Sequence, residues 1–436
     1  MSRRLQIVAL ICLTGIVFSW FAWPAAPLRA ADTREYLEVA RDLADGRIDQ
    51  LHERTPGFPL LLLMTGSAAQ LSRPLFAVLL TMHAAAVLMI SECLTLSTAG
   101  AAGFAALLWL PPFSSAAAYA MTEIPAEFAL AAAFFALWRY RRTRRMLWIA
   151  AAAAAIIAAA AIRPTYLLLS VPIALWAGMM HVRRSAALVL GLAPIAAMIA
   201  YCGFNLARFG YFGVSPKMGF SLSTRTLRVL ERIPDSDATE REMLIRARDA
   251  SLVRRGSSHT GVEFIWEGVL DQLAAEGHAS RVDLSRYMMR VNERLIAAAP
   301  LDYLLECARS AAGYWFPHTS PAALFVSRRL QFMWAAIEVA MAVLFFFQLW
   351  VIGGGALLAL LVGSTAPRVD WFFYGMAAVI VLYTMVVSCM VEVGDPRYRM
   401  PTDIFALFMI FSGANALRRS RRLKIVSSEP ALSLSL

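Results

Sequence analysis

Charged residues are scarce in this chain. They account for 16% of its 436 residues, whereas an ordinary soluble domain carries roughly 25%. Hydrophobic residues account for 59%, and they are gathered into long uninterrupted runs, for example 5–23, 101–120, 146–162 and 372–390. This composition excludes an ordinary soluble globular domain.

The apolar runs also lack the alternation of polar and apolar residues that the strands of a membrane β-barrel show. Each run is long enough to cross a hydrocarbon core of about 30 Å as a helix. Because only helices and closed barrels satisfy every backbone group in lipid, the runs indicate transmembrane helices. The first run, 5–23, is longer than the apolar core of a secretory signal peptide, so it predicts an uncleaved first span.

Patterns typical of disulfide frameworks and metal sites are missing as well. Five cysteines occur, and four of them lie in or near apolar runs. Cys307 alone lies in the large polar region, which excludes a disulfide framework there. No two cysteines have the spacing of a metal site.

Acidic residues are absent from four basic clusters that border the apolar runs. These clusters are Arg3-Arg4, 139–145, Arg183-Arg184 and 418–424. Lysine and arginine concentrate in the cytoplasmic loops of membrane proteins, so the clusters predict that both termini are cytoplasmic. The net charge of +11 is then explained by topology, which argues against nucleic acid as a partner.

With this orientation, the runs predict an all-α, polytopic transmembrane bundle of about ten spans with a helical extracytoplasmic insertion. An odd number of crossings between 330 and 362 keeps the last basic cluster inside. The chain then divides into an N-terminal transmembrane region (1–204) with an outside loop at 24–73, an extracytoplasmic insertion (205–325), a C-terminal transmembrane region (326–417) and a basic cytoplasmic tail (418–436).

The insertion is the one long polar region. Its sequence predicts amphipathic helices over 237–255 and 281–298, where charges of both signs are mixed. It serves either as a lid or acceptor-binding element, or as a covering domain, and the sequence leaves both interpretations open.

Several charged residues that are far apart in sequence fall on the outer face. They are Asp32, Glu35, Arg54, Glu123, Arg163, Arg397 and Arg399. Ionisable groups at the edge of a membrane domain are costly to bury, so they are candidates for function. Arginine binds phosphate through two parallel hydrogen bonds, and a carboxylate can act as a general base or hold a divalent cation. The set therefore suits an anionic, lipid-linked substrate.

Each of these residues also has a structural interpretation. Asp32 and Glu35 fit a capping box at the start of a helix over 33–44 that ends near Gly46. Glu123 precedes a span and could cap it, favoured by the helix dipole. The arginines of the set could extend to lipid headgroups. The sequence leaves these alternatives open.

Short motifs add a resemblance. The first outside loop reads Asp32-Thr-Arg-Glu-Tyr36 and then Arg54-Thr-Pro-Gly-Phe-Pro59. Three further motifs are Thr122-Glu-Ile-Pro125 before a span, Ile162-Arg-Pro164 after one, and Pro396-Arg-Tyr-Arg-Met-Pro401 before the last. In order and spacing, the set resembles the GT-C superfamily of membrane glycosyltransferases, in the branch with protein O-mannosyltransferases and lipid A aminoarabinose transferases. The insertion matches no motif of that family.

The resemblance implies that a sugar is transferred from a polyprenyl-phosphate donor at the outer face of the membrane, with inversion at the anomeric carbon. By position, Asp32 would be the catalytic carboxylate that activates the acceptor, and Glu123 would be the second acidic residue. The resemblance also implies that substrate is bound by Glu35, Tyr36, Arg54, Arg163, Arg397, Tyr398 and Arg399. Among these residues, the arginines would bind the donor phosphate.

The cation and the acceptor stay open. The first loop lacks a tight Asp-x-Asp pair, since the carboxylate nearest to Asp32 is Glu35, so a role for magnesium or manganese is unsettled. We expect the chain to lie in the cytoplasmic membrane of a bacterium, with its active site facing outside. The acceptor would be a lipid, polysaccharide or protein of the cell envelope.

Two other classes of function fit the composition. A transporter or flippase of lipid-linked substrates would place charged residues near the bilayer midplane and would show a repeat between its halves. A non-catalytic membrane assembly protein would bind a partner through the insertion, and its carboxylates would act only as helix caps. The absence of a clear repeat and the location of the charges at one face favour the glycosyltransferase.

Overall fold

The computed structural model of the protein describes residues 2–24, 26–30, 32–51, 53–234, 237–255, 265, 280–315, 329, 370–392 and 394–428. The regular elements within these ranges are helices, apart from one isolated β-bridge between Leu28 and Tyr119. The predicted all-α class is therefore confirmed.

Among the residues that the structure describes, four helices are long and apolar enough to cross a membrane. They are α1 (Arg3–Ala22), α4 (Arg73–Cys93), α10 (Arg184–Phe209) and α17 (Trp371–Val391). A bent pair, α5 (Thr98–Leu108) with Pro111–Ala118, adds a fifth span if it counts as one. Within the described ranges the structure thus supports four to five spans, and the total of about ten stays a prediction. The crossings predicted between 330 and 362 lie outside the described residues.

The apolar run 101–120 bends at two consecutive prolines, Pro111 and Pro112. The segment formed by α6 (Pro111–Ser114) and η1 (Ser115–Ala118) turns by 62° from α5. Proline has no N–H to donate, so Pro112 leaves the carbonyl of Leu108 without its helical partner. His83 of α4 replaces that partner, with its Nε2 3.0 Å from Leu108 O.

The central helix of the bundle is α7 (Glu123–Thr143). It packs against α4, against α8 (Leu147–Ile162) and against α18 (Met400–Ser428). The ring of Phe134 lies 5.1–5.4 Å from three phenylalanine rings of α17 and α18. Such aromatic pairs contribute about 0.5–1.5 kcal/mol each beyond their buried area. The apolar helices α8 and α9 (Ser170–Met179) are shorter than the four spans named above.

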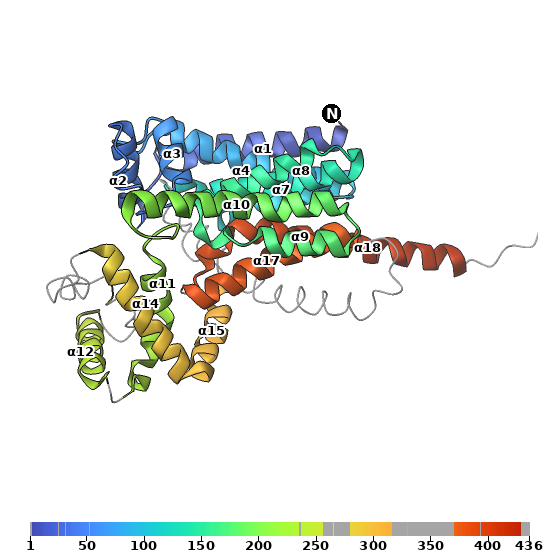
Figure 1. Cartoon of the computed structure of the whole chain (residues 1–436). Coiled ribbons are helices and arrows are strands. Elements are labelled where there is room, and N and C mark those ends of the chain that lie inside the picture. The colour runs from blue at the N-terminus through green and yellow to red at the C-terminus, as the bar shows by residue number, and fades with distance from the viewer. Residues whose placement is uncertain are drawn as a thin grey trace, which may run out of the picture.

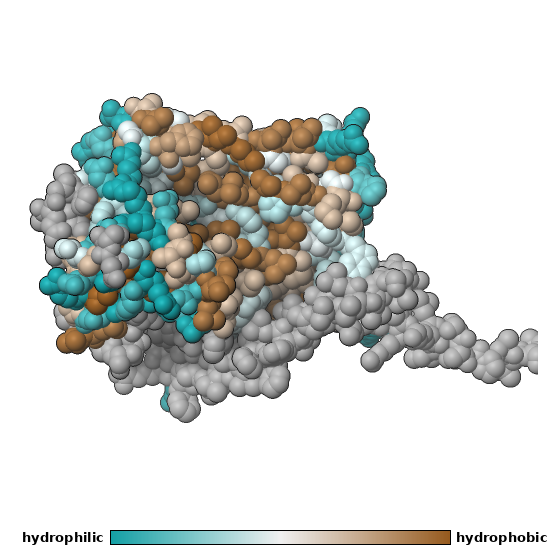
Figure 2. Space-filling view, turned by 60° about the horizontal axis from the view of Figure 1, so that its bottom comes forward, coloured by the Kyte–Doolittle hydropathy of each residue, from teal (hydrophilic) through white to brown (hydrophobic). Residues whose placement is uncertain are grey.

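The two ends of the bundle differ in charge. Arg4 at the start of α1 donates to Leu94 O just after α4 (2.8 Å), and Arg141 near the end of α7 stacks on Phe372 at the start of α17. We call this the basic end, and the opposite one, which carries α2, α3 and the insertion, the loop end (Figure 1). In Figure 2, hydrophobic surface lies between hydrophilic surfaces at the two ends. This distribution fits a bundle that crosses a membrane lengthwise.

The loop between α1 and α4 folds into two short helices. α2 (Thr33–Ala44) has the bounds that the sequence predicts, and Gly46 follows it with a φ of +73°, a conformation that glycine adopts without steric cost. α3 (Gly57–Met64) has eight residues. It is too short to span a membrane.

The insertion has a small core of its own at the loop end. Its helices are α11 (Met218–Thr226), η3 (Leu227–Arg232), α12 (Ala238–Arg255), α14 (Arg281–Ala298) and α15 (Pro300–Trp315). Buried apolar residues of these helices, among them Phe220 and Met288, pack together. The predicted helices over 237–255 and 281–298 correspond to α12 and α14. Hydrogen bonds fix the insertion to the end of α17, among them those from Tyr303 Oη to Met390 O (2.8 Å) and from Arg225 Nε to Glu392 O (2.6 Å).

Candidate functional site

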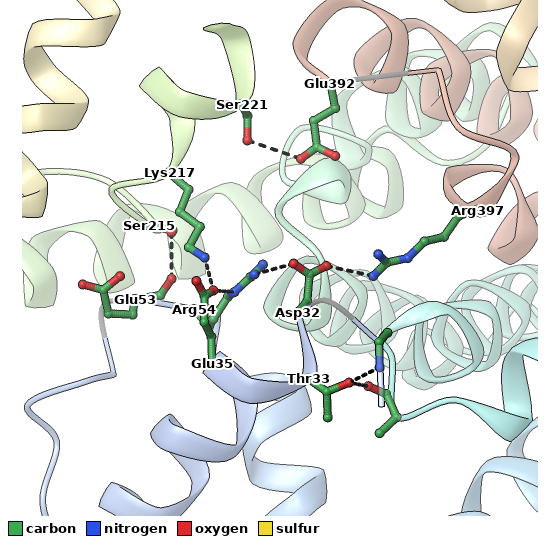
Figure 3. Close-up of polar contacts among 12 residues, drawn as sticks. Asp32, Thr33, Glu35, Glu53, Arg54, Ser215, Lys217, Ser221, Glu392 and Arg397 are labelled. Atoms are coloured by element: carbon green, nitrogen blue, oxygen red, sulfur yellow. Dashed lines mark hydrogen bonds and ion pairs between the residues drawn. The ribbon is translucent and has the colours of Figure 1, made fainter. Parts of the chain in front are cut away.

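Charged residues from separate parts of the chain meet at the loop end (Figure 3). Five positions supply them: the start of α2, the segment before α3, the start of α7, the end of α8, and the turn η7 (Pro396–Tyr398) before α18. Two further cations come from the insertion. Six of the seven charged residues predicted for the outer face belong to this group, and Arg399 does not.

Backbone contacts around Thr33 fix the position of Asp32. Thr33 Oγ1 accepts a hydrogen bond from Ala30 N (2.7 Å) and donates one to Ala120 O (3.0 Å). Ala120 N in turn donates to Leu28 O (2.9 Å), next to the isolated β-bridge. The start of α2 is thereby tied to the segment that leads into α7.

The carboxylate of Asp32 lies between two arginines. Its Oδ1 accepts a hydrogen bond from Arg54 (2.7 Å) and its Oδ2 accepts one from Arg397 (2.9 Å). Burial opposes ionisation, but the two guanidinium groups outweigh it and hold the pKa of Asp32 well below its usual range. The side chain makes no capping hydrogen bond, so the carboxylate is used for ion pairing and not for the capping box. Since 33% of the side chain is exposed, it can be reached from outside.

The motif around Arg54 is explained by close packing on the end of α8. Thr55 Oγ1 donates to Ile162 O (3.2 Å). A Cβ atom on Gly57 would come within 2.8 Å of the backbone of Ala161, closer than carbon atoms approach without a clash. Glycine is therefore required for this loop to pack against α8, and the packing brings Arg54 to the site.

Arg54 links the two acidic residues of α2. Its Nε donates to Glu35 (2.6 Å) and its terminal nitrogen donates to Asp32. Its guanidinium group also stacks over the ring of Tyr36, 4.7 Å from the centroid, and such a contact contributes about 0.5–2 kcal/mol. Tyr36 is buried, so it supports Arg54 from below and is not open to a substrate.

Glu123 lies at the centre of a second group. Its side chain is 0% exposed, and its Oε1 accepts hydrogen bonds from Arg397 (2.6 Å) and Arg163 (3.1 Å). Its Oε2 is buried without a hydrogen-bond partner among the described residues. Arg163 is only 7% exposed, so it pairs with Glu123 and does not extend to lipid headgroups. Arg397 joins Asp32 to Glu123.

The two remaining predicted residues lie on either side of this group. The Tyr398 ring lies under the guanidinium group of Arg163, 5.1 Å from centroid to Cζ. Burial and the nearby carboxylate of Glu392 raise the pKa of Tyr398, which keeps the phenol neutral. Arg399 points elsewhere, because it donates to Asp403 (2.7 Å) and to Tyr314 O (3.1 Å).

Sequence reasoning missed three charged residues of the site, namely Lys217, Arg281 and Glu53. Lys217, the residue before α11, forms an ion pair with Glu35. Arg281, the first residue of α14, pairs with Glu35 (3.2 Å) and with Glu53 (3.0 Å). One signal was available: the chain has only two lysines among its 41 basic residues, and Lys217 is the one outside the C-terminal basic cluster.

Glu35 is the carboxylate with the most cationic neighbours in this group. It accepts from Arg54, Lys217 and Arg281. Burial opposes its ionisation, but these cations lower the pKa of Glu35 to about 2. Burial and the charge of Arg54 lower the pKa of Lys217 to about 8, against the attraction of Glu35. Across the site, Glu392 accepts a hydrogen bond from Ser221 (3.4 Å).

The site does not suit a divalent cation in this arrangement. Arg397 lies between Asp32 and Glu123, where a cation bridging these carboxylates would have to bind. Within the described residues, no three His, Cys, Asp or Glu side chains are grouped so that they could hold a metal ion. The charge of the carboxylates is balanced by guanidinium groups.

Neither a protein-family model nor a curated protein matches this chain. The interpretation of the site thus depends on its geometry. An ionised, partly exposed carboxylate between two arginines can take a proton from a hydroxyl, and the same arginines can bind a phosphate group. Both groups lie at one end of an apolar bundle, where a lipid-linked phosphate would be presented.

Proposed function

We propose that the protein is a membrane glycosyltransferase of the GT-C type. It transfers a sugar from a polyprenyl-phosphate donor to an acceptor hydroxyl at the outer face of the cytoplasmic membrane of a bacterium, with inversion. The observation that carries the proposal is the Asp32 carboxylate held between Arg54 and Arg397 at the loop end. The full topology of about ten spans with both termini in the cytoplasm belongs to the same proposal.

The reaction needs one displacement. The acceptor hydroxyl attacks the anomeric carbon from the face opposite to the phosphate, and its proton passes to the Asp32 carboxylate. The bond between the anomeric carbon and the phosphate oxygen breaks, and its electron pair leaves with the polyprenyl phosphate. Guanidinium groups fixed beside that oxygen stabilise the growing negative charge. Positioning of donor and acceptor supplies the rest of the acceleration.

Donor binding is coupled to the strength of the base. With two arginines on its oxygens, Asp32 is a weak base, because these cations hold its pKa low. A phosphate group that binds Arg54 or Arg397 offsets their positive charge and raises the proton affinity of Asp32. The base thus becomes effective when the donor is in place.

Glu123 has a positioning role in this proposal. It is fully buried, so an acceptor does not reach it, and it holds both Arg397 and Arg163. In this proposal Asp32 is therefore the base, and Glu123 is the residue that orients the arginines.

A transporter of lipid-linked substrates is the second candidate, and one observation favours it. His83 lies in the middle of α4, buried, with Nδ1 3.1 Å from Glu127 Oε2. A buried ionisable pair within apolar helices is typical of proton-coupled transport. The pair has a structural role as well, because His83 also bonds Leu108 O at the bend.

Transfer from a lipid-linked donor separates the candidates. Membranes carrying the chain would be given a panel of radiolabelled polyprenyl-phosphate sugars, and label in acceptors would be measured. We expect Asp32→Asn to lower transfer by about 10²–10⁴-fold at equal protein level, and Asp45→Asn, an exposed carboxylate at the end of α2 paired with Arg47, to leave it unchanged. Transfer at the wild-type rate in Asp32→Asn would remove Asp32 as base. A wild-type chain inactive with every donor, yet moving a donor across vesicles, would favour the transporter.

A further inference from the structure

The surroundings of Glu35 contain more positive charge than one carboxylate requires. Three cations contact it: Arg54 at 2.6 Å, Arg281 at 3.2 Å and Lys217. They come from the first loop, from α14 and from the residue before α11, so three segments far apart in sequence converge on one oxygen pair. The desolvation of partly buried ion pairs can cost more than their mutual attraction contributes to stability.

Two of these cations occupy unfavourable positions in their helices. Lys217 is the N-cap residue of α11 and Arg281 is the first residue of α14. The helix dipole disfavours cations at a helix N-terminus and favours anions there. Both helix starts therefore favour binding of an anion next to the two side chains.

The ion-paired cations and carboxylates of the site form one connected group. The cations are Arg54, Arg163, Lys217, Arg281 and Arg397, and the carboxylates are Asp32, Glu35, Glu53 and Glu123. Glu392 lies across the site and outside these ion pairs. A phosphodiester carries one negative charge, as the Glu35 carboxylate does, so it can take the place of Glu35 among its three cations.

We propose that Arg54, Lys217 and Arg281 form the binding site for the donor phosphate, and that Glu35 is an internal counter-ion which the phosphate displaces. The identity of the phosphate as a polyprenyl phosphodiester rests on the proposed function. Two of the three cations belong to the insertion, so the insertion completes the substrate site. Arg54 contacts both Glu35 and Asp32, and it thereby connects phosphate binding to the base.

The proposal makes an unusual prediction about Glu35. A residue that binds substrate or a cation weakens binding when it is removed, whereas removal of a competing counter-ion strengthens it. Binding of a radiolabelled polyprenyl monophosphate without sugar to the purified full chain in nanodiscs tests this directly. We expect Glu35→Gln to lower Kd by about tenfold, which corresponds to about 1.4 kcal/mol. Lys217→Gln and Arg281→Gln should each raise Kd by about tenfold.

Two controls isolate the phosphate. Glu38→Gln changes an exposed carboxylate of the same helix that pairs with Arg34, and it should leave Kd unchanged. A polyprenol without phosphate should bind every variant alike. Glu35→Gln leaves three cations close together, so its thermal unfolding is measured beside that of the double variant Glu35→Gln/Lys217→Gln, in which one cation is removed as well. If the single variant does not fold, the double variant replaces it. The double variant should then bind the phosphate more tightly than Lys217→Gln does.

The results distinguish this proposal from the proposed function. Weaker binding in Glu35→Gln, unchanged binding in both Lys217→Gln and Arg281→Gln, or no binding to the wild-type chain would overturn the inference, even if transfer occurs. Tighter binding in Glu35→Gln by a chain that transfers no sugar would support the phosphate site and leave the glycosyltransferase proposal without support.

Discussion

Arginines at the two ends of the bundle use the same side chain in different ways. At the basic end, Arg139, Arg141 and Arg142 stack on aromatic rings, 4.5–5.1 Å from the centroids, and within the described residues none of them forms an ion pair. At the loop end, Arg54, Arg163 and Arg397 each pair with a buried or partly buried carboxylate.

The difference separates two functions of charge. Arginines without acidic partners keep their full charge for the membrane surface, where it fixes orientation. Arginines held by carboxylates have a fixed geometry and a field that is partly neutralised, which suits recognition of a substrate anion. The presence of an arginine alone does not indicate its function, whereas the residues that it contacts do.

The largest expected difference between the ends concerns Arg397. Arg397→Gln leaves Glu123 with Arg163 alone and removes one partner of Asp32. Breaking such a buried pair lowers the free energy of unfolding by about 3–5 kcal/mol. Loss of one of the two arginines that position the base Asp32 lowers transfer by about 10²-fold.

The comparison variant is Arg141→Gln, which loses one contact with a ring worth about 0.5–1 kcal/mol. Thermal unfolding in detergent and transfer per folded molecule are measured for both. Equal losses in the two variants would show that the ends do not differ in the way proposed.

A smaller effect is expected when both members of the central pair are changed. In Arg397→Gln/Glu123→Gln the buried carboxylate is removed together with its arginine partner, so part of the stability lost in Arg397→Gln returns. We expect a coupling energy of about 0.5–3 kcal/mol from the double-mutant cycle. Strictly additive losses would mean that Glu123 does not position Arg397.

The pH dependence of phosphate binding is the next effect in size. The pKa of Lys217 is lowered to about 8, so this side chain loses its proton as the pH rises through 8, well before an ordinary lysine does. Affinity for polyprenyl phosphate should therefore fall about three- to tenfold between pH 7 and pH 9. In Lys217→Arg the cation stays charged, and the profile should be flat across the same range. A profile with the same slope in both proteins would assign the titration to another group.

Much of the transmembrane fold could be predicted because lipid imposes a simple rule. A run of apolar residues must form a helix, and Pro111-Pro112 must interrupt one. The start of α2 at Thr33 follows in the same way from local helix signals. The number of spans was harder to judge, because α7 carries Glu123, Glu127 and several arginines, so its composition is not that of a simple span.

The contacts of the site could be predicted only where a motif marks them. Arg54 and Arg397 stand next to prolines and a glycine, and Asp32 stands at the start of a predicted helix, so each is marked by a pattern in the sequence. Lys217 and Arg281 reach the site because the insertion folds back onto the first loop, which depends on long-range packing. Arg399 carries the same motif signal as Arg397, but two residues further along the chain it faces Asp403 instead.

The smallest expected effect tests the basic end itself. A triple variant, Arg139→Gln/Arg141→Gln/Arg142→Gln, should change transfer per correctly oriented molecule by less than about twofold. Each lost ring contact contributes only about 0.5–1 kcal/mol, and all three contacts lie at the end of the bundle opposite to the site. The fraction of molecules with a cytoplasmic C-terminus should fall, since the positive charge that fixes the orientation is reduced. Protease access to a C-terminal tag in oriented vesicles measures that fraction, and transfer is normalised to it. A loss of normalised transfer similar to that of Arg397→Gln would mean that charge at the basic end acts on the site through the length of α7.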